Sequence, residues 1–140
     1  MQFMLIVKGG CETGRSPQEE FVAAVMSHTQ ELRKAGVLVE LSRLHPSSQG
    51  ARVKLLRQDR MVVDGPFAET KELVGGYWII QANSLNEAIE WAKRAPAPED
   101  VPWEIEIRQF RELELFYPAE QLDAGTEVSG VLAKAYKQSE

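Results

Sequence analysis

The chain has 140 residues, a formal net charge of −5 and one cysteine. This length predicts one main folded domain, and the acidic balance argues against binding to a nucleic-acid backbone, which needs a basic face. A lone cysteine excludes an intramolecular disulfide and a cysteine-based metal site. No apolar run approaches the roughly 20 residues of a membrane span, and the N-terminus lacks signal-peptide features. A cytoplasmic protein without a membrane segment is therefore expected.

The first elements are a strand and a helix. The continuous apolar run Phe3–Val7 predicts a strand that is buried on both faces. Ser16 can cap a helix that begins at Pro17, and Glu19 completes a capping box. This helix is expected to run to about Ala35, before a terminating glycine.

The middle of the chain predicts strands and turns. Val37–Leu44 is rich in β-branched and apolar residues, so we expect a strand there. Arg52–Leu56 and Met61–Val63 predict a hairpin closed by Gln58-Asp59-Arg60. Pro66–Leu73 is expected to form a short helical or turn segment.

The next elements repeat the strand–helix–strand order. Tyr77–Gln81 predicts a strand, and Ser84 with Glu87 forms a second capping box that starts a helix ending before Pro96. Apolar residues alternate with charged ones over Trp103–Arg108, which indicates a half-exposed strand.

This order predicts an α+β fold: the ferredoxin-like split βαβ plan with an inserted hairpin. Phe3–Val7 and Tyr77–Ile80 are apolar on both faces, so we expect a second sheet to cover the face without helices, as in a homodimer. Residues 1–110 would form this domain. Residues 111–140 would add a helix, because an apolar stripe follows the helical period at Val128, Val131, Leu132, Ala135 and Tyr136.

Three side chains are candidates for acid–base chemistry. Asp64 ends a strand and could be a general base in a cleft, but turn chemistry alone also explains an aspartate before Gly-Pro. His28 on the first helix could be its partner or simply a histidine at the core edge, and His45 could also reach a cleft. Two histidines without a suitably spaced carboxylate or cysteine predict no metal site.

Aromatic side chains near Asp64 could wall a pocket for a small molecule. Tyr77, Trp78 and Phe67 are the candidates, and core packing is the alternative for the first two. The segment GGCETGRS at residues 9–16 nearly matches a phosphate-binding loop, but arginine replaces its lysine. No cofactor is therefore expected.

The segment Asp64–Ile80, DGPFAETKELVGGYWII, closely resembles the signature of the DGPF group of YCII-related proteins. Further similarities are AGVLVE at Ala35–Glu40, LHP at Leu44–Pro46, the helix segment at Ser84–Pro96 and the closing EIEIRQF strand. The resemblance covers about residues 1–110. It implies a ferredoxin-like domain that dimerises through its sheet face, giving a dimeric α+β barrel.

The resemblance implies little about activity. Some DGPF relatives are associated with extracytoplasmic-function sigma factors, a YCII-like branch includes a dehydrochlorinase of a chlorinated aromatic, and muconolactone-isomerase-like proteins share the barrel. The YciI-type branch carries a His-Asp pair in a cleft. Asp64 matches the DGPF motif itself, whereas the helix histidine of the YciI-type branch falls near Val25.

Three hypotheses follow. The first is a cofactor-free lyase or isomerase in which Asp64 moves a proton and His28 or His45 assists. The second is a non-catalytic module that senses a small ligand or docks on a regulatory protein. The third is a structural dimerisation domain in which Asp64 only caps a turn.

Overall fold

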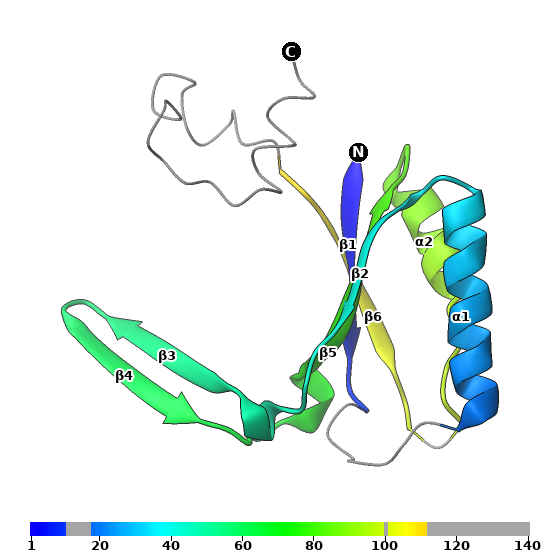
Figure 1. Cartoon of the computed structure of the whole chain (residues 1–140). Coiled ribbons are helices and arrows are strands. Elements are labelled where there is room, and N and C mark those ends of the chain that lie inside the picture. Colours follow the sequence, from blue (N-terminus) through cyan, green and yellow to red (C-terminus); the bar gives the residue numbers. More distant parts are fainter. Residues whose placement is uncertain (11–17, 100, 112–140) are drawn as a thin grey trace, which may run out of the picture. The chain divides into compact units, whose positions relative to one another are not determined.

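A computed structural model of the chain describes residues 1–10, 18–99 and 101–111. The chain divides into two units, Met1–Gln109 and Phe110–Glu140. The first unit contains every helix and strand described below (Figure 1). The helix expected within residues 111–140 lies outside the described residues.

The regular elements follow the predicted order. The strands are β1 (Gln2–Lys8), β2 (Leu38–Arg43), β3 (Ala51–Leu56), β4 (Asp59–Asp64), β5 (Val74–Gln81) and β6 (Glu104–Gln109). The α-helices are α1 (Glu19–Lys34) and α2 (Leu85–Lys93). Two short 3-10 helices occur at Ser47–Gln49 and Thr70–Glu72.

Four of the strands form one antiparallel sheet in the order β2-β5-β1-β6. Both α-helices cover the same face of this sheet (Figure 1). This arrangement confirms the predicted α+β class and is compatible with the ferredoxin-like plan. No helix among the described residues is both long and apolar enough to cross a membrane.

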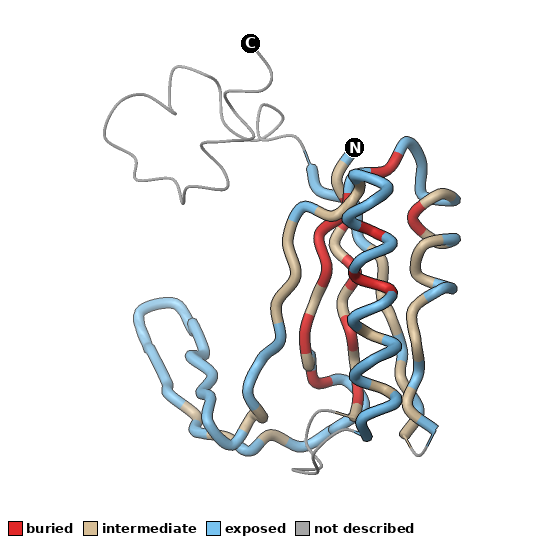
Figure 2. The backbone as a smooth tube through the Cα atoms, turned by 45° about the vertical axis from the view of Figure 1, so that its right-hand side comes forward, coloured by how far each residue is buried: buried red, intermediate tan, exposed pale blue. Residues whose placement is uncertain are grey.

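The core lies between the sheet and the helices, where the buried segments of Figure 2 gather. Its largest fully buried side chains are Phe3, Leu5, Leu32 and Ile80, each worth about 1.5–3 kcal/mol of burial free energy. Within β1, residues facing the helices are buried, and those between them are half-buried. In the single chain, β1 is therefore buried only on the face toward the helices, and the prediction that both of its faces are buried holds for that face alone.

Two local predictions about where elements begin and turn were wrong. Helix α1 begins at Glu19, and its cap position is Gln18, which has an extended backbone with a ψ of 145° and no side-chain cap bond. The helix thus starts later than a cap at Ser16 requires. The hairpin turns at Arg57-Gln58, since Asp59 and Arg60 already pair with Leu56 and Leu55.

The Ser84 cap of α2 is confirmed, and the reciprocal bond goes to the N–H of Asn83, one residue before the cap. The Glu87 N–H donates to the Ser84 Oγ over 3.1 Å, and the Glu87 carboxylate accepts from the Asn83 N–H over 2.8 Å. The chain therefore enters this helix as predicted.

The hairpin β3–β4 forms a separate two-stranded sheet that extends away from the main sheet (Figure 1). All of β3 is exposed, including Val53 at 56% and Leu55 at 68%, and Val62 on β4 is 64% exposed. Val53 and Val62 are direct partners, so these side chains share one apolar face of the hairpin.

Candidate functional site

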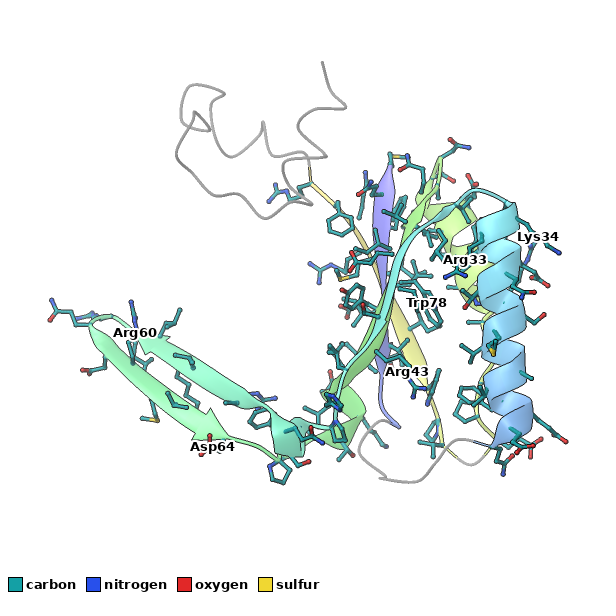
Figure 3. The ribbon with its side chains drawn as sticks, viewed as in Figure 1. Arg33, Lys34, Arg43, Arg60, Asp64 and Trp78 are labelled. Atoms are coloured by element: carbon teal, nitrogen blue, oxygen red, sulfur yellow. The ribbon has the colours of Figure 1, made fainter. Side chains whose placement is uncertain are left out.

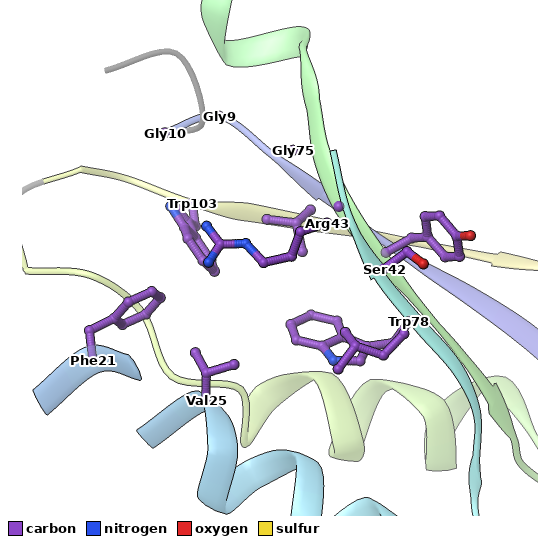
Figure 4. A pocket seen from close by; sticks show the side chains of 13 residues that line it. Gly9, Gly10, Phe21, Val25, Ser42, Arg43, Gly75, Trp78 and Trp103 are labelled. Atoms are coloured by element: carbon purple, nitrogen blue, oxygen red, sulfur yellow. The ribbon is translucent and has the colours of Figure 1, made fainter. Parts of the chain in front are cut away.

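A cavity of about 110 Å³ lies between the sheet and α1 (Figure 4). Strands β1, β2 and β5, helix α1, the segment after β1 and the residue before β6 contribute to it. Its lining residues are Val7, Gly9, Gly10, Phe21, Val25, Leu41, Ser42, Arg43, Gly75, Gly76, Tyr77, Trp78 and Trp103. Most of this surface is apolar or aromatic, as is usual for a small-molecule pocket.

Glycines make room for the cavity on the sheet. Residues two apart in a strand share a face, so Gly76 lies on the same face as Trp78 and leaves space beside it. A Cβ at Gly76 would lie 2.8 Å from the carbonyl oxygen of Ser42, which shows how closely β2 and β5 approach. Only glycine fits at this position without a shift of the backbone.

The turn after β1 packs against one aromatic wall. Gly10 has a φ of +73°, and a Cβ there would collide with the Trp103 indole. Trp103 in turn contacts Phe21 of α1 edge to face, with ring centroids 5.1 Å apart. Gly10, Trp103 and Phe21 therefore form a continuous packed wall from β1 to α1.

Arg43 is the one charged side chain on this lining, as far as the structure describes the chain. It is exposed at the end of β2, and it extends over the cavity toward the side where Trp103 lies (Figure 4). Tyr77 lines the cavity but turns its side chain to the other face of the sheet, where its hydroxyl donates to the Glu40 carboxylate over 3.0 Å.

Trp78 is the predicted wall residue that lies deepest in the core. It is 3% exposed and packs edge to face against His28, with ring centroids 5.7 Å apart. Among the described residues, Trp78 Nε1 and His28 Nδ1 have no hydrogen-bond partner. His28 Nε2 lies 3.4 Å from the carbonyl oxygen of Trp91. His28 thus supports the wall from behind and does not line the cavity.

The structure does not bring Asp64 to either histidine. Asp64 is exposed at the end of β4 on the hairpin, whereas Trp78 lies in the main sheet (Figure 3). Asp64 lines neither this cavity nor a second, more open one. The second cavity, of about 410 Å³, includes His45 and Phe67 in its lining. In the single chain, the three candidate acid–base residues therefore occupy three different places.

Of the predicted wall residues, Tyr77 and Trp78 line this cavity. Sequence reasoning did not name Arg43, Trp103 and Phe21 as site residues. The last two carried a signal, because Phe21 lies on the apolar stripe of α1 and Trp103 opens the alternating pattern of β6. Arg43 carried none, since a basic residue at a strand end is ordinary. Val25, near which the resemblance places a family histidine, does line the cavity.

The groups with shifted pKa values lie on the other face of the sheet. Lys8 Nζ donates to a Glu106 oxygen over 3.1 Å and lies 3.5 Å from Glu72. This hydrogen bond lowers the pKa of Glu106 and raises that of Lys8. Among the described residues, no group of three or more His, Cys, Asp or Glu side chains could hold a metal ion.

Comparison with known proteins identifies a family. A family model described as the YCII-related domain matches residues 1–111. An uncharacterized protein of Rhizobium meliloti (strain 1021) is 34% identical over 87 residues, which cover 62% of this chain and 68% of that protein. The match to the family model includes every described helix and strand. The chain therefore belongs to the YCII-related domain family.

Proposed function

We propose that this YCII-related protein binds a small aromatic molecule in the cavity between the sheet and α1. The observation that carries the proposal is the aromatic lining formed by Phe21, Trp78 and Trp103. Pockets that are already formed, mostly apolar and fitted with a few polar groups are the usual small-molecule sites. Gly10 and Gly76 support the proposal, because a side chain at either would disturb the wall or the floor.

The size of the cavity limits the ligand. Its volume is about 110 Å³, whereas an engineered apolar cavity of about 150 Å³ binds benzene. A single ring is therefore the largest group that the described cavity would enclose, and any substituent would extend toward its exposed side.

Binding without turnover is the function that this lining favours. Among the described lining residues there is no carboxylate and no imidazole, and general acid–base catalysis needs such a group within hydrogen-bond reach of the substrate. The alternative is a cofactor-free lyase or isomerase. It would require Asp64, His28 or His45 to reach the ligand from outside the described lining.

The proposal includes a homodimer formed through the face of the sheet that has no helices. Ile79 is 5% exposed on this face, and the half-buried Met4 and Ile6 lie beside it on β1. The single chain already buries Ile79, but covering Met4 and Ile6 with a second copy would remove more apolar surface from water. The exposed apolar face of the hairpin supports association as well, because a lone hairpin is marginally stable in water.

Titration of the full chain with benzyl alcohol tests the binding function, with tryptophan emission as the readout. We expect saturable binding that is lost in Val25→Phe, which fills the cavity, and kept in Met26→Phe. Met26 is the matched control because it lies next to Val25 on α1 but is 61% exposed. Equal binding by both variants would refute this site.

Nuclear magnetic resonance spectra of the ligand, followed over hours, separate the two functions. An unchanged ligand supports binding alone. Chemical conversion that depends on Asp64 would establish the lyase or isomerase alternative instead.

A further inference from the structure

The position of Arg43 gives the cavity a chemical preference. Most of the lining is apolar or aromatic, and the guanidinium is the charged group that the described lining contains. Its side chain extends over the cavity from the end of β2 (Figure 4). A permanent positive charge beside three aromatic rings favours a ligand with an anionic group attached to a ring.

Arg43 also lacks a partner of its own. Within the described part of the chain it makes no hydrogen bond or ion pair, although other arginines do, such as Arg108 with Glu106 at 3.6 Å. Arg52 and Arg94 lie over the rings of Phe67 and Trp91, respectively. The donors of Arg43 therefore stay available for a ligand.

On the basis of the proposed binding function, we infer that the cavity takes a single-ring aromatic carboxylate, with the carboxylate on Arg43. A guanidinium binds a carboxylate through two parallel hydrogen bonds, and these charge-assisted bonds are about twice as strong as neutral ones. Because Arg43 is exposed whereas Trp78 is 3% exposed, the charge would remain near water while the ring enters the core. This orientation avoids the high cost of burying a charge.

Three probes of similar shape test the inference on the unmodified full chain: benzoate, benzyl alcohol and benzylammonium. Tryptophan emission or calorimetry gives each dissociation constant. We expect benzoate to bind most tightly and benzylammonium most weakly. Because this comparison needs no variant, it remains informative whatever a substitution does to folding.

Substitution of Arg43 then assigns the effect to a residue. A hydrogen bond to a charged group is worth about 1.5–3 kcal/mol, so Arg43→Gln should weaken benzoate binding about 10- to 100-fold. Because Arg43 itself lines the cavity, binding of benzyl alcohol should weaken too, but by much less than binding of benzoate. Arg33→Gln is the matched control, since Arg33 is exposed near the end of α1 and does not line the cavity.

The outcomes separate the two proposals. If benzyl alcohol binds but benzoate binds no tighter, or if Arg43→Gln leaves the preference intact, the carboxylate inference is wrong and the binding function stands. If none of the three probes binds, the binding function fails, and this inference fails with it.

Discussion

Gly65 packs directly against the backbone carbonyl of Ser47, and a Cβ at Gly65 would overlap that oxygen. The Gly65 N–H also donates to the Gly50 carbonyl over 2.9 Å, and the Phe67 N–H donates to the Ser47 Oγ over 3.0 Å. These contacts join the end of β4 to the segment before β3. Gly65 and Phe67 thus fix the base of the hairpin, whereas the side chain of Asp64 is exposed.

Substitutions at Asp64 and at Gly65 should therefore have different effects on stability. Gly65→Ala forces the backbone apart, and overpacking of this kind costs about 1–3 kcal/mol of unfolding free energy. Asp64→Asn changes an exposed group, so its effect should stay within about 0.5 kcal/mol. Urea denaturation of both variants measures the difference. A loss of stability in Asp64→Asn as large as that in Gly65→Ala would show that the carboxylate itself holds the turn.

The fold could be predicted because its signals are local. The alternation in β6 and the capping box at Ser84 each depend on residues close in sequence, and both elements formed where expected. The start of α1 was misplaced because Gln18 keeps an extended backbone. A sequence pattern predicts that a helix or strand is present more reliably than it predicts the residue at which that element begins.

The candidate site was harder to predict because it depends on packing between distant segments. The cavity exists where Gly76 lacks a side chain and where Trp103 and Phe21 meet across the fold. Asp64 was expected to face a cleft because it ends a strand. That strand pairs within the hairpin and not within the main sheet, so its end lies away from the cavity.

The wall around Trp103 should be sensitive to Gly10. Gly10→Ala adds a Cβ that collides with the indole, in addition to the cost of a left-handed backbone, which is roughly 1–2 kcal/mol for a residue other than glycine. Gly36→Ala is the matched control, because Gly36 has a φ of +71° but a Cβ added there would meet no atom within 4 Å. Tryptophan emission should shift in Gly10→Ala alone. The same shift in both variants would mean that Gly10 does not position Trp103.

The proposed dimer can be tested on the free face of the sheet. Met4 lies opposite Ile79 and Arg108 on the neighbouring strands. In the monomer, the carboxylate introduced by Met4→Glu therefore lies near the Arg108 guanidinium and can pair with it. Across a dimer interface the same carboxylate would meet apolar surface, and we expect it to convert the dimer to a monomer in sedimentation equilibrium. Met26→Glu on the exposed side of α1 should remain dimeric. A wild-type chain that sediments as a monomer at micromolar concentration would contradict the dimer proposal.

The ion pair between Lys8 and Glu106 predicts a dependence of stability on pH. The hydrogen bond from Lys8, reinforced by its charge, holds the pKa of Glu106 below its ordinary value of 4.5. A carboxyl group with a lowered pKa stabilises the fold above its unfolded pKa, and this contribution is lost as the pH falls through the folded value. The matching rise in the pKa of Lys8 adds stability that is lost only at alkaline pH, above its ordinary value of 10.5.

Glu106→Gln should therefore flatten the acid side of the stability profile. Melting temperatures measured between about pH 7 and about pH 3 should fall less steeply for this variant than for the wild type, because the neutral amide has no proton to take up. Glu104→Gln is the matched control: Glu104 is exposed on the same strand, and the structure gives it no ion pair among the described residues. Its profile should follow the wild type. If Glu104→Gln flattens the profile as much as Glu106→Gln does, the acid sensitivity reflects general charge and not the Lys8 contact.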